Sequence, residues 1–299
     1  MKMSSVGFIG VGTIGGPMAA RLVGAGHALV VNDVSADASA RLVAEGARAA
    51  DSVAALAREC AVVFLSLPGP PQVAAVMDAL LAAPGTVRTV VDLSTNALAL
   101  NRELAARAAT QGIAYLDAPV SGGKVAAKDG TLAVMVGGDE AAFTAVRPLI
   151  ECFAKHIFHL GAPGAGTLAK LVNNQIFLCA SVLIQEGFVM GAKAGMDPST
   201  LLEVLKVSSA GSLVARAPLL LARRFEQDIF ALSIAAKDVT LALESGAAVG
   251  ASMPATAAAL GVYQQALAQG LGHEDFYATV KVLEQQAGIT LPPLARPKA

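Results

Sequence analysis

A glycine-rich segment near the N-terminus constrains this chain more than any other feature. Gly10, Gly12 and Gly15 form the pattern G-x-G-x-x-G directly after an apolar run, and a helix-compatible segment follows from Pro17. The first glycine allows a tight turn, the second allows the backbone to approach a pyrophosphate, and the third allows a helix and a strand to pack closely. Phosphates would then sit at a helix N-terminus, where unpaired N–H groups favour negative charge.

An acidic residue follows these glycines at the spacing typical of a dinucleotide-binding unit. Asp33 ends a second apolar run and can accept hydrogen bonds from the adenosine ribose hydroxyls. It would repel a 2′-phosphate, and Val34 beside it carries no positive charge. The sequence therefore predicts NAD as the cofactor, with NADP as the alternative. The contacts predicted in this region are Gly10, Gly12, Thr13, Ile14, Gly15, Asn32 and Asp33.

Composition excludes several classes of function. The 299 residues are enough for two domains and a large core, and the net charge of −1 leaves no electrostatic footprint for nucleic acid. No apolar stretch is expected to reach the length of a membrane span, since Glu186 interrupts the longest candidate. The N-terminus enters a strand at once, and three scattered cysteines have no metal-ligand spacing. We therefore expect a cytoplasmic protein with no signal peptide, membrane or metal site.

The first half alternates between strand-like and helix-like segments, as in a Rossmann-like doubly wound parallel sheet. The predicted strands are 6–10, 29–32, 62–65, 89–92, 115–118, 132–136 and 156–160. The predicted helices between them are 17–25, 36–44, 52–58, 71–81, 97–111 and 140–152. Ligands of such sheets bind at the carboxyl ends of the strands, so those ends are where functional residues are expected.

The second half shows only helical patterns. One long helix is predicted over 166–193, a length of about 40 Å at 1.5 Å per residue. Gly195 is expected to stop it, and Asp197 before Pro198 is expected to cap the next helix. Shorter helices are predicted over 199–207, 213–223, 231–249, 254–267 and 276–286. The chain thus divides into a NAD-binding Rossmann-like domain, 1–163, and an all-α domain, 164–299, which begins with the long interdomain helix.

Lys170 is a candidate catalytic residue near the start of that helix. Lys170 and Asn174 are four residues apart and share a helix face, with Asn173 beside them. A lysine in the first turn is unfavourable because that end of a helix is already positive, and its neighbours are apolar. Both features are expected to lower its pKa toward neutrality, where an amine can act as a general acid or base. An ordinary solvated lysine on a helix surface is the competing interpretation.

The turn at Ser121, Gly122 and Gly123 follows a predicted strand and therefore lies at the ligand-binding edge. Its consecutive backbone N–H groups, with no Cβ in the way, can hold a carboxylate, and the Ser121 hydroxyl adds a donor. An ordinary strand-to-helix turn is the alternative. Three further places are candidates for cofactor contacts, although spacing alone favours structural roles equally: Leu67 and Pro68, Thr95, and Lys237 next to Asp238.

With these segments in place, the chain resembles the β-hydroxyacid dehydrogenases, which include 3-hydroxyisobutyrate dehydrogenase and tartronate semialdehyde reductase. Four segments match in order: the glycine loop from Phe8 to Met18, Asp117–Gly123 continuing to Leu132, Gly164–Asn174, and Lys237-Asp238. The resemblance spans roughly residues 5 to 290. Two places depart from the family pattern. Asn96-Ala97 follow Thr95, and small residues precede Lys237.

The resemblance implies a role for each site residue. Lys170 corresponds to the catalytic lysine and Asn174 to a catalytic asparagine, with Asn173 also positioning substrate. Ser121, Gly122 and Gly123 correspond to the loop that binds the substrate carboxylate. The implied cofactor contacts are the glycine loop, Asp33, Leu67, Pro68, Thr95 and Lys237. The family fold is a Rossmann-like domain, shared with 6-phosphogluconate dehydrogenases, followed by an all-α domain that often forms a dimer or tetramer interface.

The implied reaction is NAD(P)-dependent oxidation of a small β-hydroxy acid resembling 3-hydroxyisobutyrate, in an enzyme that is a homodimer or homotetramer. The alternative within this chemistry is a reductase of small semialdehydes such as glyoxylate, succinic semialdehyde or tartronate semialdehyde. Imine reductases resemble the family but generally lack the lysine, so Lys170 argues against them. A non-catalytic binding relative is also disfavoured, since it would be expected to lose Lys170 and to carry a basic surface.

Overall fold

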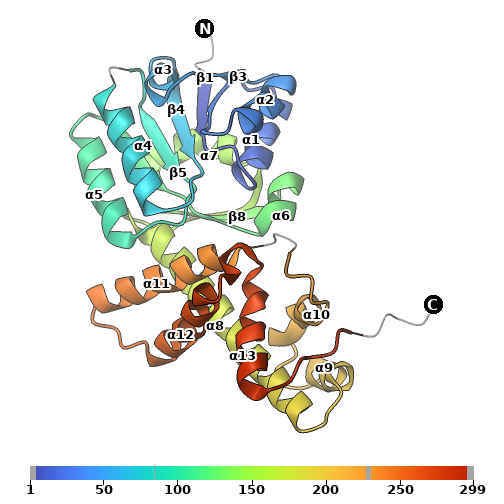
Figure 1. Cartoon of the computed structure of the whole chain (residues 1–299). Helices are drawn as coiled ribbons and strands as arrows, with labels where there is room; N and C mark the ends of the chain where they lie inside the picture. The colour runs from blue at the N-terminus through green and yellow to red at the C-terminus, as the bar shows by residue number, and fades with distance from the viewer. Residues whose placement is uncertain (1–4, 84, 227–229, 295–299) are drawn as a thin grey trace. The chain divides into compact units, whose positions relative to one another are not determined.

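The computed structural model describes residues 5–83, 85–226 and 230–294, and the chain divides into two compact units, Met1–Leu171 and Val172–Ala299. The first unit contains the strands and the helices that cover them, while the second is built from helices (Figure 1). A single helix, α8 (Ala165–Lys193), contributes its first turns to the first unit and the rest to the second. Each unit is described separately below.

The first unit is built around a sheet of parallel strands. Its strands are β1 (Ser5–Ile9), β2 (Leu29–Asn32), β3 (Arg48–Ala49), β4 (Cys60–Leu65), β5 (Thr89–Asp92) and β6 (Ala114–Asp117), in the order β3-β2-β1-β4-β5-β6. Its helices are α1 (Gly15–Gly24), α2 (Ala36–Ala44), α3 (Val53–Ala57), α4 (Pro70–Ala82), α5 (Leu98–Ala109), α6 (Gly123–Asp129) and α7 (Glu140–Ile150). This arrangement confirms the predicted Rossmann-like topology.

Both faces of this sheet are buried, because successive side chains of a strand point to opposite sides. Phe8, Phe64 and Leu116 belong to one core, which includes residues of α1, α2 and α7. Val63 and Val90 belong to the other core, with residues of α3, α4 and α5. Figure 1 shows α1 and α2 on one side of the strands and α4 and α5 on the other. The apolar runs of the sequence reflect this burial on both faces.

A second, smaller sheet departs from the sequence-based expectation of one continuous sheet. It contains β7 (Val120–Ser121), β8 (Leu132–Val136) and β9 (Ala154–His159), with β7 antiparallel to β8 and β8 parallel to β9. It joins the main sheet through an isolated antiparallel bridge between Asp117 and Gly137. The antiparallel direction of β8 relative to β7 breaks the parallel pattern, and neither this direction nor the short helix α6 leaves a clear periodic signal in the sequence.

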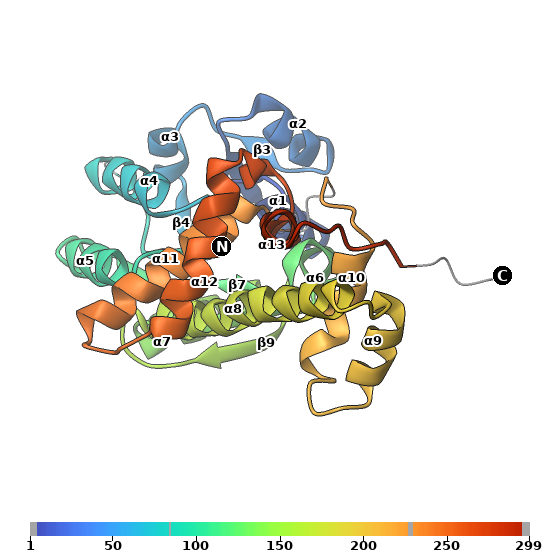
Figure 2. The same ribbon diagram turned by 60° about the horizontal axis from the view of Figure 1, so that its bottom comes forward.

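The second unit is helical, as predicted. Besides most of α8 it contains α9 (Pro198–Lys206), α10 (Ala217–Leu221), α11 (Leu232–Ala248), α12 (Pro254–Ala268), α13 (Val280–Ala287) and the 3₁₀ turns Leu213–Arg216, Leu271–His273 and Phe276–Thr279. Tyr263 and Phe188 are fully buried in its core. Figures 1 and 2 both show α9 beside the last turns of α8, where a Cβ at Gly191 would lie 2.8 Å from Leu201 Cδ2.

Helix boundaries in the second unit differ from prediction at one place in particular. The helix expected over 213–223 is a 3₁₀ turn followed by the five-residue α10, which ends before Arg223 at a left-handed φ of 55°. Pro218 near the start of α10 lacks the N–H that a continuous helix would use. By contrast, the stop at Gly195 (φ 88°) and the new N-cap at Asp197, whose carboxylate accepts from Thr200 N at 2.8 Å, are confirmed.

The apolar composition of α8 contradicts one prediction made from the sequence. Among the described residues, one helix is long enough and apolar enough to cross a membrane, judged by length and composition alone, and this helix is α8. The expectation that no stretch reaches this length was therefore wrong, because Glu186 alone does not lower the mean hydropathy sufficiently. Polar side chains along α8 are nonetheless engaged within the second unit, where Gln185 is fully buried and contacts Ser181 and Thr279.

Candidate active site

The glycine loop after β1 has the geometry that a pyrophosphate site requires. Gly10 has a φ of 87°, and a Cβ there would lie 2.2 Å from Ser66 O. A Cβ at Gly15 would lie 2.0 Å from Gly10 O, so α1 packs closely on the loop. A Cβ at Gly12, in contrast, would meet nothing within 4 Å. Packing within the protein therefore requires glycine at positions 10 and 15. At position 12, by contrast, the space beside the backbone is empty and open to a ligand.

The N-terminus of α1 is also suited to an anion. Ile14 occupies the N-cap position and makes no side-chain cap hydrogen bond, and the first turn contains no acidic residue. Helix N-termini without such caps leave backbone N–H groups available for a phosphate. Thr13 and Ile14 lie between the open position at Gly12 and this helix start. The residues present therefore fit the diphosphate of a dinucleotide.

Asp33 holds the glycine loop against the end of β2. Its Oδ2 accepts from Val11 N at 2.7 Å and its Oδ1 accepts from Ser35 N at 2.8 Å. Each carboxylate oxygen keeps a further lone pair, so Asp33 can still receive ribose hydroxyls. Val34 is fully exposed beside it. Asn32, another predicted contact, donates one amide N–H to Ala50 O at 2.9 Å and keeps its amide oxygen for a further partner.

The loops after β4 and β5 are joined to each other, as expected for neighbouring strand ends. Leu67 N donates to Ser94 Oγ at 2.9 Å. Pro68 and Thr95 follow these two residues; Pro68 is exposed and Thr95 is half-buried. The structure thus places these two loops, both predicted to contact the cofactor, side by side at the carboxyl edge of the main sheet.

The predicted carboxylate-binding turn lies between β7 and α6. Gly122 and Gly123 have φ values of 130° and 70°, which residues with a side chain rarely adopt. Both glycines are exposed and Ser121 is half-buried. A Cβ at Gly122 would lie 2.6 Å from Ala126 Cβ. The conformation therefore requires glycine and leaves the backbone accessible.

The start of α8 is anchored to β6 and β8 within the first unit. Asp117 accepts from Gly164 N through Oδ1 and from Thr167 N through Oδ2, both at 2.7 Å. Burial raises the pKa of Asp117, and these two backbone hydrogen bonds act in the opposite direction. A Cβ at Gly166 would lie 2.1 Å from Met135 O. Because it is fixed at these points, the first turn of α8 belongs to the dinucleotide-binding unit.

Lys170 lies on this anchored part of α8 and is 9% exposed, so it is not the solvated surface lysine of the competing interpretation. The helix begins at Ala165, which places Lys170 in the second turn rather than the first. The helix dipole acts mainly within the first turn, so its predicted effect on Lys170 is weaker than the sequence suggested. Burial beside apolar neighbours is the feature that remains.

The second unit brings three predicted residues together through a fourth. Asn173 Nδ2 donates to Asn174 Oδ1 at 2.9 Å, and Asn174 Nδ2 donates to Asp238 Oδ2 at 2.6 Å. Lys237 Nζ lies 3.0 Å from Asp238 Oδ1, and the two groups form an ion pair without a hydrogen bond. Asp238 is 1% exposed, and Asn174 is 3% exposed. The residue that connects the set, Asp238, was noted beside Lys237 in the sequence but given no role of its own.

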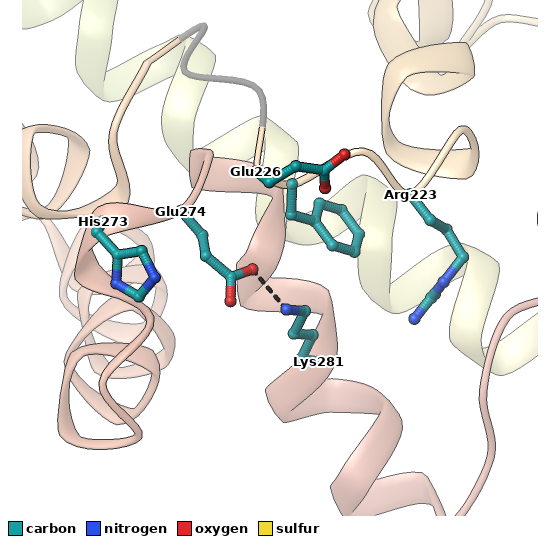
Figure 3. Close-up of a pocket in the computed structure, with 6 residues that line it drawn as sticks. Arg223, Glu226, His273, Glu274 and Lys281 are labelled. Carbon is teal, nitrogen blue, oxygen red and sulfur yellow. Dashed lines mark hydrogen bonds and ion pairs between the residues drawn. The ribbon is translucent and has the colours of Figure 1, made fainter.

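A cavity elsewhere in the second unit contains none of the predicted residues. Its volume is about 380 Å³, and it is lined by Arg223, Phe225, Glu226, His273, Glu274 and Lys281 (Figure 3). Lys281 pairs with Glu274 at 2.5 Å, and Arg223 pairs with Glu284. The charged groups of Arg223 and Lys281 lie over the ring of Phe225, 5.5 and 5.2 Å from its centre. Because these cations are paired, the cavity gives no indication of a ligand.

Comparison with known proteins supports the assignment from geometry. Residues 5–161 match the family model of the NAD binding domain of 6-phosphogluconate dehydrogenase, and residues 164–283 match that of the NAD-binding region of NADP-dependent 3-hydroxyisobutyrate dehydrogenase. The chain belongs to the β-hydroxyacid dehydrogenase family. It is an NAD(P)-binding oxidoreductase, and the predicted family, fold class and cofactor are confirmed.

Three relatives illustrate this likeness. The chain is 36% identical to 2-(hydroxymethyl)glutarate dehydrogenase of Eubacterium barkeri, over 97% of this chain and 98% of the relative. It is 33% identical to 2-hydroxy-3-oxopropionate reductase of Escherichia coli, over 94% and 98%. The structure of Mycobacterium tuberculosis 3-hydroxyisobutyrate dehydrogenase with L-serine has a TM-score of 0.85, 32% identity, and coverage of 94% and 99%.

Proposed function

We propose that this enzyme catalyses the reversible NAD-dependent oxidation of a small β-hydroxy acid resembling 3-hydroxyisobutyrate. The observation that carries the proposal is the burial of Lys170 on a helix start that is anchored within the dinucleotide-binding unit. A buried lysine is costly unless its environment uses it, and a desolvated amine can exchange protons near neutral pH. The dehydrogenase with L-serine that the chain resembles supports a small acid that carries a hydroxyl group.

Each predicted residue then has a chemical task. The N–H groups of Ser121, Gly122 and Gly123 bind the substrate carboxylate and thereby fix the position of the carbinol carbon. Neutral Lys170 takes the proton of the hydroxyl group during oxidation. During reduction the protonated amine stabilises the developing negative charge on oxygen and returns the proton. Asn174, one turn further along α8, orients the reacting oxygen, and Asn173 supports it.

The cofactor contacts are assigned to groups that the structure leaves suitable for them. When bound, the nicotinamide accepts or returns the hydrogen of the carbinol carbon with its electron pair. Gly10, Gly12, Thr13, Ile14 and Gly15 form the diphosphate loop. Asn32 and Asp33 are assigned to the adenosine side, and Leu67, Pro68, Thr95 and Lys237 to the remaining contacts. We propose NAD rather than NADP because Asp33 is negative and Val34 offers no cation.

The alternative function is reduction of a small semialdehyde by the same residues. It is favoured by the likeness to a 2-hydroxy-3-oxopropionate reductase. The test is a comparison of kcat/KM for 3-hydroxyisobutyrate, glycerate, threonate, glyoxylate and succinic semialdehyde, each with the NAD and the NADP cofactor. Highest efficiency with 3-hydroxyisobutyrate and NAD supports the proposal. Highest efficiency with a semialdehyde supports the alternative, and activity with none of them contradicts both.

We also propose that the protein is a homodimer or homotetramer of the cytoplasm. Apolar side chains at Val172, Ile176, Leu183 and Met190 are 48 to 72% exposed and recur at helical spacing along α8, so they form one stripe that a second copy could cover. The free thiols of the cysteines fit a reducing compartment. A functional domain boundary near residue 163 is supported by the two family matches, 5–161 and 164–283.

A further inference from the structure

Five buried polar side chains within the first unit form a network with no role in the steps above. They come from the end of β5 and the loop after it, from α5, from β6 and from the first turn of α8. Their exposures are 0% for Asp92, Asn96, Asn101 and Thr167 and 4% for Tyr115. Buried polar groups are costly unless they are hydrogen-bonded, so the partners of each one reveal how the network is held.

In one series of hydrogen bonds within this network, each side-chain amide donates to the next side chain, from Asn96 to Thr167. Ala97 N donates to Asn96 Oδ1 at 2.8 Å, which fixes the orientation of that amide. Asn96 Nδ2 therefore donates to Asn101 Oδ1 at 2.7 Å. Asn101 Nδ2 in turn donates to Thr167 Oγ1 at 2.5 Å, and the Thr167 hydroxyl bonds to the Asp117 carboxylate. This series of bonds connects the loop after β5 to the N-terminal cap of α8.

A branch of the network reaches the other cofactor loop. The Tyr115 hydroxyl lies 2.8 Å from both Asn101 Oδ1 and Asp92 Oδ2. Asp92 Oδ1 accepts from Ser94 N at 3.0 Å, and Ser94 Oγ accepts from Leu67 N at 2.9 Å. The loops after β4 and β5 and the start of α8 are therefore held by one set of buried bonds.

We propose that this network is a positioning device for the reaction, in which Asn101 and Thr167 fix the Lys170 amine relative to the loops that carry Leu67 and Thr95. The proposal rests on the function proposed above. Thr167 is three residues before Lys170, so it sets both the rotation and the axial position of the turn that carries the amine. Misplacement of a catalytic group by about 1 Å can lower the rate on the order of 100-fold.

The central test removes only the hydroxyl of Thr167. Thr167→Val keeps the shape of the side chain, and Thr167→Ser restores the hydroxyl. The matched control is Thr279→Val, because Thr279 is also fully buried and contacts Gln185 Oε1 at 2.8 Å in the second unit. We expect Thr167→Val to lower kcat about tenfold or more and to displace the limb of the kcat/KM pH profile that reports Lys170. Thr167→Ser and Thr279→Val are expected to stay within about twofold of wild type.

A second readout needs neither substrate nor cofactor. Hydrogen–deuterium exchange of the peptide 164–171 is expected to be faster in Thr167→Val and unchanged in Thr279→Val. Tyr115→Phe, which removes a more distant member and keeps its ring, is expected to produce the same changes to a smaller degree. If Thr167→Val does not fold, Tyr115→Phe tests the positioning role, and wild-type kcat, pH profile and exchange in that variant would overturn it.

The outcomes separate this inference from the proposed function. A wild-type kcat, pH profile and exchange rate in Thr167→Val would overturn the positioning role while leaving Lys170 in place. An equal effect of Thr279→Val would show a general loss of stability and would also overturn it. Undiminished turnover after Lys170→Ala would instead refute the proposed function, whatever the exchange experiment shows.

Discussion

A methyl group at position 12 tests the dinucleotide site without disturbing the fold. A Cβ at Gly12 meets nothing within 4 Å, and the backbone there is not in the left-handed region. Alanine can therefore adopt the native conformation. A glycine-to-alanine change at such a position stabilises a protein by about 0.4–1 kcal/mol, because the unfolded chain loses freedom. We expect Gly12→Ala to unfold at the same or a slightly higher urea concentration than wild type.

Binding of NAD is expected to respond in the opposite direction. The methyl group would occupy the space through which the backbone approaches the diphosphate, and at least one hydrogen bond from a backbone N–H to a charged oxygen would be lost. Such a bond contributes about 1.5–3 kcal/mol. The dissociation constant for NAD is then expected to rise by about 10- to 150-fold, since 1.4 kcal/mol corresponds to a factor of ten.

Isothermal titration of NAD into the two proteins measures this change directly. Gly24→Ala is the matched control, because a Cβ at Gly24 also meets nothing within 4 Å and lies at the far end of α1. Gly15→Ala gives the contrasting case, since its Cβ would lie 2.0 Å from Gly10 O and both stability and binding are expected to fall. Wild-type affinity in Gly12→Ala would refute the assignment of this loop to the diphosphate.

Three further changes probe other parts of the account. Asp33→Ala is expected to shift the ratio of kcat/KM toward NADP, and a wild type that already prefers NADP would contradict the role of Asp33. Burial raises the pKa of Asp92 above its ordinary value of 3.8, so the folded state holds the extra proton. The free energy of unfolding is then expected to fall as pH rises above about 4, by up to about 1.4 kcal/mol per unit, until the pH passes the folded-state pKa. Asp92→Asn is expected to flatten this slope in urea titrations at several pH values, and an unchanged slope would exclude Asp92 as its source. Ile176→Glu combined with Leu183→Glu is expected to lower the molar mass seen by light scattering, and a monomeric wild type would contradict the proposed interface.

Features with a local cause could be predicted from the sequence. The turn at Gly10, the packing at Gly15 and the acid at Asp33 lie within one βαβ unit, so spacing alone was sufficient to place them. The stop at Gly195 and the cap at Asp197 depend on the conformations of single residues and were also predictable. The parallel arrangement of the predicted strands in the main sheet followed from the alternation of strands and helices.

Features that depend on distant residues could not be predicted in this way. Asn101 and Thr167 are 66 positions apart, and no periodic pattern indicates that their side chains meet. Asn174 and Asp238 are 64 positions apart, and an acidic residue within an apolar helix is only a weak signal of their contact. The separate sheet of β7, β8 and β9 depends on β8 running antiparallel to β7, and strand patterns do not record the direction of a strand.

Turnover of Lys170→Ala tests the central claim most directly. We expect kcat for the best substrate of the panel to fall by a factor on the order of 10² or more, because proton transfer loses its acid and base. The dissociation constant for NAD is expected to remain that of wild type. Lys155→Ala, which removes an exposed lysine of β9, serves as the control and is expected to leave both quantities unchanged. A Lys170→Ala enzyme with the kcat of wild type would contradict the account.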